Sequence, residues 1–186
     1  MYPVLRLIWQ LYRHRTSPAL PVTGLHVSQH YCLPWDIDLW MELNNGRTLT
    51  LYDLGRIPLA GRMGLIKVLR AKRWGLTIAG ASVRYRRRIR MFERIEMRSR
   101  LVCWDDKFLY LEQSMWTPDG QCANHILYRA AVTGKGGIVP PETICAELGH
   151  EAAPPPHPDW VRAWIEADAA RPWPPMQDTV RDPVQE

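Results

Sequence analysis

The hydrophobic pattern changes its period near Leu76, and this change restricts the fold more than any other feature of the 186-residue sequence. Before it, helical spacing runs from about Asn45 to Arg56 and again from about Leu59 to Arg73. Gly55 and Pro58 predict a break between these two helical stretches. After Leu76, apolar residues alternate with polar ones, which is typical of strands.

Four strands are expected in this second part, joined by turn signals at Asp105-Asp106 and at Pro118-Asp119-Gly120. They run from Leu76 to Arg90, Arg94 to Trp104, Phe108 to Thr117 and Cys122 to Val132. Another strand, from Gly24 to Leu33, precedes the helical part. One strand, a helical segment and an antiparallel meander predict an α+β fold in which a curved sheet wraps around a helix.

The length of the chain predicts one domain with a flanking segment at each end. Residues 1–23 form an N-terminal arm, residues 24–138 form the domain, and residues 139–186 form a tail. Ten of the 16 prolines lie between Pro140 and Pro183, so we expect an extended tail with one short helix from about Asp159 to Ala170.

The N-terminal arm contains an amphipathic stretch within residues 1–15. Its apolar residues follow helical spacing: Val4, Leu7, Ile8 and Leu11. Arg6 and the lack of a small-residue cleavage site speak against a signal peptide, and no stretch approaches the ~20 apolar residues that cross a bilayer. The pattern favours packing on the domain or on a partner subunit. Peripheral contact with a membrane, helped by Arg6, Arg13 and Arg15, is the alternative.

The four cysteines are widely spaced in the sequence. They show no C-x-x-C pair and no Cys/His spacing typical of zinc: Cys32, Cys103, Cys122 and Cys145. We therefore expect reduced thiols, a cytoplasmic protein and no metal site.

The positive charge is concentrated in one stretch. Lys and Arg outnumber Asp and Glu by 24 to 19, an excess that suits nucleic acid, anionic lipid or a phosphate-bearing ligand. The stretch from Ser82 to Val102 carries a net charge of +6, and the rest of the chain sums to −1. A local basic face favours a discrete anion, and its few interleaved aromatic residues do not form a stacking platform for nucleic acid.

The residues best suited to chemistry stand just before the first helical stretch. Asp36 and Asp38 precede the paired asparagines Asn44 and Asn45. Asn is a strong helix N-cap, and the unpaired first-turn amides and the helix dipole favour an electron-rich carbonyl oxygen at the same place. A carboxylate beside a polarised carbonyl is a minimal hydrolytic site.

This stretch resembles the hotdog-fold acyl-CoA thioesterases of the 4-hydroxybenzoyl-CoA thioesterase type. Their pattern runs without gaps onto seven residues: Asp36, Asp38, Leu43, Asn44, Asn45, Asp53 and Arg56. The resemblance extends from about Leu25 to Gly134. Within the family, the segments Arg86–Arg90 and Cys103–Asp106 are most similar to thioesterase superfamily member six and its bacterial relatives.

The sequence also departs from the family pattern. The Gly-His of the family is Met41-Glu42 here, and a helix tyrosine is Thr48. The family's strand proline is Arg88, and the Gly-Asp that follows that strand is Phe92-Glu93. Gly lets a ligand approach the backbone closely, so Met41 is expected to block or shift that approach.

The resemblance implies hydrolysis of an acyl thioester, with acyl-CoA or acyl-carrier protein as substrate and no cofactor besides the coenzyme A of the substrate. It also implies a homodimer or tetramer with sites between protomers. Asp38 would be the general base or the nucleophile, and an amide near Asn45 or Gly46 would polarise the carbonyl. Asp36 would orient the loop, and Asp53 would contact the site across the subunit boundary.

A substrate-binding surface is expected beside this site. With period two, four arginines lie on one face of the predicted strand: Arg84, Arg86, Arg88 and Arg90. Such a row either binds the phosphates of coenzyme A or of a carrier arm, or is a solvated face held by surface salt bridges. Trp40 lies in the candidate loop and either lines an acyl tunnel or packs in the core.

Two alternatives to catalysis remain at this point. Asp38 has a loop-capping role as its structural alternative, and Met41-Glu42 favours a non-catalytic acyl-thioester-binding protein. Hydratase activity is disfavoured, because the Asp of a hotdog hydratase is followed five residues later by a His, whereas Asp36 and Asp38 lead to Met41 and Leu43.

Overall fold

The computed structural model describes residues 2–150 and 153–176. The chain divides into two compact units, Met1–Pro155 and Pro156–Glu186. The second unit contains helix α5 (Asp159–Ala169), close to the bounds expected for the tail helix.

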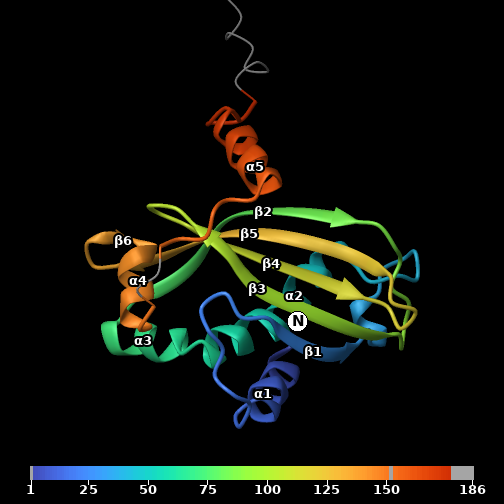
Figure 1. Ribbon diagram of the computed structural model, residues 1–186. Coiled ribbons are helices and arrows are strands. Elements are labelled where there is room, and N and C mark those ends of the chain that lie inside the picture. The colour runs from blue at the N-terminus through green and yellow to red at the C-terminus, as the bar shows by residue number, and fades with distance from the viewer. Residues whose placement is uncertain (1, 151–152, 177–186) are drawn as a thin grey trace, which may run out of the picture. The chain divides into compact units, whose positions relative to one another are not determined.

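The first unit consists of a curved antiparallel sheet with helices on one face and along one edge (Figure 1). The strands lie in the order β1 (His26–Tyr31), β3 (Arg94–Trp104), β4 (Leu109–Trp116), β5 (Cys122–Gly134) and β2 (Gly75–Tyr85), and β6 (Gly137–Val139) pairs with β5. The helices are α1 (Val4–Arg13), α2 (Asn45–Arg62), α3 (Leu65–Lys72) and α4 (Pro141–Glu147), with a 3-10 turn η1 at Pro34–Asp36. The predicted α+β architecture, a sheet wrapped around a helix, is confirmed.

Helix α2 runs through Gly55 and Pro58 without the predicted break, so that prediction is wrong. Gly55 serves tertiary packing, because a Cβ at this position would lie 2.6 Å from Met97 Sδ and 2.7 Å from Ser99 Oγ on β3. The helix ends instead before Gly64, whose φ of 84° lies in the left-handed region that favours glycine. The absence of a side chain at Gly55 therefore allows α2 to lie close to β3.

The tail contributes a helix that was not predicted from the sequence. Helix α4 buries Ile144 and Cys145 in a core cluster with Leu65 and Val132, so the tail holds two helices rather than one. The proline content predicted an extended chain here, but these prolines are compatible with a helix. Pro140 is the N-cap and Pro141 lies in the first turn, where a missing N–H breaks no helical hydrogen bond. The first unit accordingly extends past residue 138, the predicted end of the domain, to residue 155.

Helix α1 lies along the free edge of β1 and binds it through polar side chains. Arg6 Nη2 donates to the Tyr31 carbonyl at 2.7 Å, and Gln10 Nε2 donates to the Gln29 carbonyl at 3.4 Å. In an edge strand, every second residue points its backbone carbonyl and N–H away from the sheet. When such an edge is uncovered, these groups can pair with a strand of another chain. Helix α1 therefore covers this edge, while no strand of the described chain pairs with the outer edge of β2.

The described residues include no helix long and apolar enough to span a bilayer. All four cysteines are free, and burial raises the pKa of the Cys32, Cys103 and Cys145 thiols to about 11.

A histidine cluster under α1 predicts acid sensitivity. Burial is the main cause that lowers the pKa of His26 to about 4 and that of His30 to about 3, and positive charges on Arg62 and Arg6 add to it. In the unfolded chain both rings bind a proton near pH 6.5, so below that pH the unfolded state binds more protons and stability falls. We expect about 2 kcal/mol lost per histidine between pH 6.5 and pH 5, measured by urea denaturation.

The His26→Gln variant provides the control for this measurement. It should remove the part of the pH dependence that comes from His26, and an equally steep loss in the variant would contradict the assignment to this residue.

Candidate functional site

The N-terminus of α2 presents two backbone amides that no bond in the described chain uses. Asn44 caps the helix: its Oδ1 accepts from the Arg47 amide at 3.0 Å, and its carbonyl accepts from the Thr48 amide at 2.8 Å. The N–H groups of Asn45 and Gly46 have no acceptor among residues 2–150 and 153–176. They are available to a ligand oxygen at the positive end of the helix dipole.

A pocket of about 180 Å³ opens at this helix end. It is lined by Glu42, Leu43, Asn45, Thr48, Tyr85, Arg86, Arg87, Arg88, Ile89 and Asn124. Tyr85 Oη donates to the Asn45 carbonyl at 3.3 Å, and burial raises the pKa of this phenol. The pocket therefore combines hydrogen-bond donors, positive charge and one carboxylate.

Asp38 holds a tight turn in front of the helix. Its Oδ1 accepts from the Trp40 amide at 2.9 Å, and its backbone N–H donates to the Glu42 carbonyl at 2.9 Å. Met41 in this turn has a φ of 60°, a region that favours glycine, which is the residue the resembling family has there. Asp38 thus has the loop-capping contact, and it does not line the pocket.

Glu42 is the carboxylate that the structure places in the pocket, and it is not among the site residues predicted from the sequence. Its Oε2 lies 2.8 Å from Arg88 Nε, and its side chain is 28% exposed. The available signal was its position, since Glu42 replaces the His of the family pattern two residues before the N-cap.

Asp36 is fully buried and has a structural environment. Its carboxylate accepts from Arg6 at 2.6 Å, from Arg47 at 2.6 Å and from the Leu33 amide at 3.0 Å. Burial alone would raise the pKa of Asp36, but these three hydrogen bonds outweigh it and hold the pKa below its ordinary value. The residue joins α1, the turn η1 and the first turn of α2.

Three other predicted site residues lie outside the pocket. Asp53 accepts a hydrogen bond from Tyr2 Oη at 2.9 Å and forms an ion pair with Arg56. Gly46 is exposed at the helix start, and Trp40 is 76% exposed in the turn that Asp38 caps, outside the core. Of the four predicted catalytic residues, only Asn45 lines the pocket.

The predicted arginine row on a strand face is wrong, because β2 ends at Tyr85. The amides of Arg86 and Arg87 both donate to the Ala123 carbonyl, at 2.8 and 3.0 Å, and the regular pairing with β5 stops there. Of the four predicted arginines, only Arg84 belongs to the strand. The single-face arrangement fails because alternation requires continuous strand geometry.

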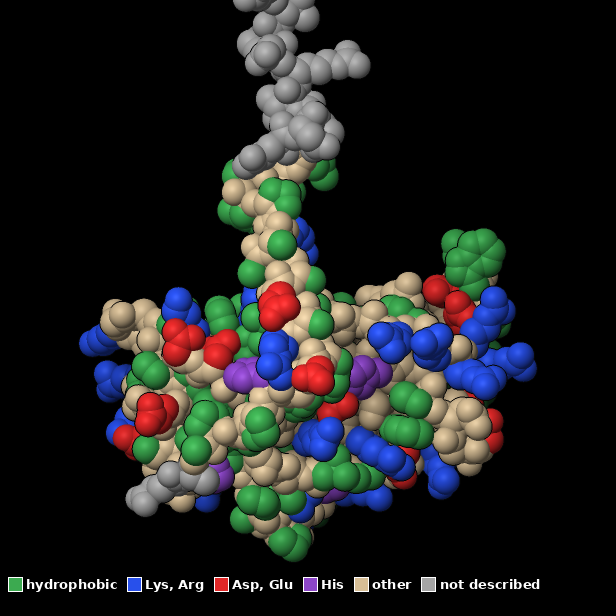
Figure 2. Space-filling view, turned by 45° about the horizontal axis from the view of Figure 1, so that its top comes forward, with side chains coloured by type: hydrophobic (Ala, Val, Ile, Leu, Met, Phe, Trp, Pro, Cys, Tyr) green, Lys and Arg blue, Asp and Glu red, His purple; other side chains and the backbone are tan. Residues whose placement is uncertain are grey.

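The arginines nevertheless gather in space. Three of the four predicted ones, together with Arg87 and Glu93, line a shallow open depression, whose arginines are Arg86, Arg87, Arg88 and Arg90. It shares the first three of these with the pocket at the start of α2. Figure 2 shows the basic side chains collected at this end of the molecule, at the right of the view. A loop therefore builds the basic surface that a strand was expected to build.

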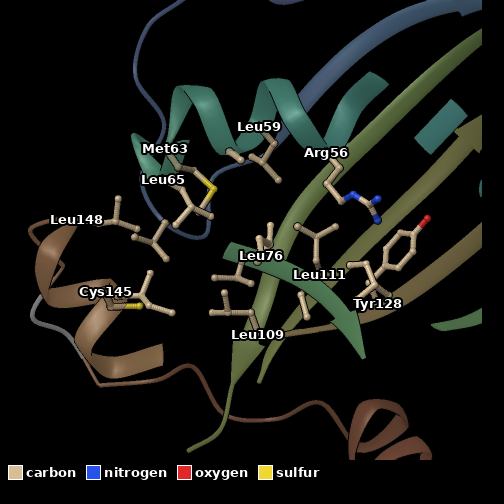
Figure 3. A pocket seen from close by; sticks show the side chains of 16 residues that line it. Arg56, Leu59, Met63, Leu65, Leu76, Leu109, Leu111, Tyr128, Cys145 and Leu148 are labelled. Carbon is tan, nitrogen blue, oxygen red and sulfur yellow. The ribbon is translucent and has the colours of Figure 1, made fainter. Parts of the chain in front are cut away.

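A separate apolar cavity of about 40 Å³ lies at the other end of α2 (Figure 3). Leucines from α2, α3, β4 and the segment after α4 surround it, among them Leu59, Leu65, Leu109 and Leu148. Arg56 closes one end, with its Cζ 4.4 Å from the centre of the Tyr128 ring. The cavity shares no lining residue with the pocket, and its apolar walls favour a dry interior.

Metal ligation finds no support in the part of the chain that the structure describes, since no three His, Cys, Asp or Glu side chains gather there in a ligating group. The groups that line the pocket are amides, one carboxylate, a phenol and guanidinium groups.

Comparison with known proteins gives the family. The model of the thioesterase-like superfamily matches residues 32–165. The chain belongs to this superfamily. Protein THEM6 of Xenopus laevis is 32% identical over 135 residues, which are 72% of this chain and 64% of that protein. Protein THEM6 of Drosophila melanogaster is 31% identical over 163 residues, 83% of this chain and 76% of that protein.

The share of each relative's own length that the match covers differs among the THEM6 proteins. The match takes up 64% of the Xenopus protein and 48% of the Danio rerio THEM6, so the chain spans less than two thirds of the length of these relatives.

Solved structures of other proteins share the fold. YbaW, a probable thioesterase from Escherichia coli, matches with a TM-score of 0.63 at 18% identity, covering 68% of this chain and 97% of its own. SAV2348 from Staphylococcus aureus, solved in complex with CoA, matches with a TM-score of 0.57 at 13% identity, covering 73% of this chain and 87% of its own. The predicted hotdog fold of this thioesterase-like chain is confirmed.

Proposed function

We propose that this protein hydrolyses an acyl thioester at the N-terminus of α2. The observation that carries the proposal is the pair of unbonded amides of Asn45 and Gly46 beside a pocket with a basic rim. A hydrogen bond from one of these amides stabilises the carbonyl oxygen most when that oxygen becomes an oxyanion in the transition state. One such donor typically increases the rate by ~10²–10³. Membership of the thioesterase-like superfamily supports the reaction class.

The reaction needs a base but no redox group. Water attacks the thioester carbon, a carboxylate takes the proton, the tetrahedral oxyanion accepts from the Asn45 or Gly46 amide, and the thiolate leaves as the carbonyl re-forms. We assign the base, or alternatively the attacking carboxylate, to Asp38, whose second oxygen makes no bond within the described chain. Glu42 is the competing carboxylate, since it already lines the pocket.

The proposed active unit is a homodimer, because Asp38 and Asp53 lie outside the pocket of their own protomer. The open outer edge of β2 supports this, since two such edges can pair into one continuous sheet. Most side chains of β2 are exposed along its whole length. We propose that Asp38 of one protomer serves the pocket of the other, and that Asp53 contacts it across the same boundary.

Light scattering in solution tests the dimer. The expected mass is twice the 21.6 kDa of one chain. A stable monomer with full activity would contradict a site shared between protomers. A tetramer would contain the proposed dimer if protomers with substituted Asp38 and protomers with wild-type pockets form active mixed assemblies.

The substrate is proposed to be an acyl-CoA, whose phosphates the arginine depression would neutralise. A structural relative was solved with CoA, which supports this carrier. Hydrogen bonds between guanidinium and phosphate are among the strong ones in proteins. An acyl-carrier protein, with the same phosphopantetheine arm, is the competing carrier.

The double variant Arg86→Gln/Arg90→Gln is expected to raise KM for acyl-CoA about 10-fold, because it removes two phosphate partners from an exposed site. The matching acyl-pantetheine, which lacks the phosphates, should show no change in KM. The variant Arg70→Gln/Arg162→Gln, which removes two exposed arginines elsewhere, is the control for net charge. Equal KM increases for both substrates would contradict phosphate binding.

A non-catalytic acyl-thioester-binding protein remains the second candidate, and the turn contact of Asp38 with the Trp40 amide favours it. The deciding experiment offers purified protein short-chain to long-chain acyl-CoAs and measures released thiol. Tight binding without thiol release over hours would establish binding alone and overturn hydrolysis.

A further inference from the structure

Helix α1 turns its apolar face away from the protein. Six of its large apolar side chains are exposed, by 39 to 82%: Val4, Leu5, Ile8, Trp9, Leu11 and Tyr12. The apolar stripe of a surface helix normally faces the core. Here only Leu7 of the large apolar residues packs against the core cluster.

The inward face of the same helix is polar. Arg6 forms an ion pair with the buried Asp36 at 2.6 Å, and Gln10 is 4% exposed against β1. His14 stands edge-on to His26, with ring centres 4.6 Å apart. The carbonyls at the free edge of β1 need polar partners, so a helix that covers this edge must turn its polar face inward. The outward apolar face follows from that contact.

The charged side chains of the N-terminal segment all have one sign. Residues 1–35 contain no Asp or Glu, and Arg13 and Arg15 are exposed at the end of the helix. Arg15 Cζ lies 3.7 Å from the centre of the Tyr12 ring, and the rings of Trp9 and Tyr12 stack at 6.0 Å. Apolar side chains together with Trp, Tyr and Arg suit the boundary between acyl chains and anionic headgroups.

We propose that α1 docks this protein on an anionic lipid surface, with its apolar face in the headgroup region and Arg13 and Arg15 on the lipid phosphates. A second copy of the chain fits this face less well, because basic residues would meet basic residues. In addition, α1 lies at the β1 edge of the sheet, opposite the open β2 edge (Figure 1). Pairing of two protomers through β2 leaves α1 uncovered. The inference is independent of thioester hydrolysis.

Vesicle flotation with the full-length protein tests the proposal. We expect binding to vesicles of phosphatidylcholine with phosphatidylglycerol, weaker binding to phosphatidylcholine alone, and a decrease with added salt. The variant Ile8→Gln/Trp9→Gln should bind at least about 10-fold more weakly, because two exposed apolar side chains no longer enter the lipid.

The control variant Ile138→Gln/Trp173→Gln removes the same residue types from exposed positions outside α1 and should bind as the wild type does. The variant Arg13→Gln/Arg15→Gln should lose the preference for the anionic vesicles. Absence of wild-type binding would overturn the proposal, as would an equal loss in the control. A change of oligomeric mass in Ile8→Gln/Trp9→Gln without any vesicle binding would assign the face to a second copy instead. Thiol release from a soluble acyl-CoA should stay unchanged in all these variants, which separates this test from that of the proposed function.

Discussion

An Asp38→Asn variant is expected to lose at least about 100-fold in kcat/KM toward acyl-CoA, because removal of a general base typically costs ~10²–10⁴ in rate. Asn keeps an oxygen at Oδ1, so the hydrogen bond from the Trp40 amide that holds the turn can persist. The loss should appear in kcat at saturating substrate, while the dissociation constant for acyl-CoA stays close to that of the wild type. Released thiol and ligand binding are the two measurements.

Glu42→Gln is the matched comparison, since it neutralises the carboxylate that lines the pocket. We expect a loss below about 10-fold for it, because Glu42 then acts only through its ion pair with Arg88. A large loss in Glu42→Gln together with near wild-type activity in Asp38→Asn would move the base to Glu42. Thermal unfolding of both variants excludes a general loss of folded protein as the cause.

The second large effect is expected on stability, from Asp36→Ala. This substitution leaves the guanidinium groups of Arg6 and Arg47 without their common carboxylate in a buried setting, and breaking such a pair typically costs ~3–5 kcal/mol. It also frees the amide of Leu33. Urea unfolding at neutral pH measures the loss, with the exposed Asp106→Ala as a control that should change stability by less than about 0.5 kcal/mol.

The acid dependence of this contribution has a defined sign. The pKa of Asp36 is lower in the folded chain than in the unfolded chain, so its stabilisation is complete above the unfolded value near 4 and disappears as the pH falls through the folded value. Above pH 5, Asp36→Ala should therefore shift the stability of the protein by a constant amount. A loss under 1 kcal/mol, or one that varies between pH 5 and pH 7, would contradict the role assigned to Asp36.

The strands illustrate what a local pattern can and cannot predict. β3 has the predicted bounds, Arg94–Trp104, because alternation and the turns on both sides are local signals. The end of β2 was missed, because the alternation continues to Arg90 while the backbone leaves β5 at Tyr85. Gly55 was misread for the same reason, since its function is contact with β3, more than 40 residues later in the chain.

The candidate site divides in a similar way. The start of α2 at Asn45 was predictable, because N-cap chemistry is written into neighbouring residues. The partners of Asp36 were not, since Arg6 lies 30 residues away and reaches it only after α1 settles on β1. Glu42 lies at the pocket because its backbone forms an isolated antiparallel β-bridge with that of Arg90. No spacing in the sequence indicates this pairing.

The contact of α1 with β1 also limits how many copies can join by sheet extension. Each protomer offers one edge, that of β2, because the polar side chains of α1 occupy the other. If copies join through their β2 edges, as proposed, addition edge to edge stops at two, and growth into a fibre would first require the helix to leave the sheet. Helix α1 thus blocks polymerisation through the β1 edge.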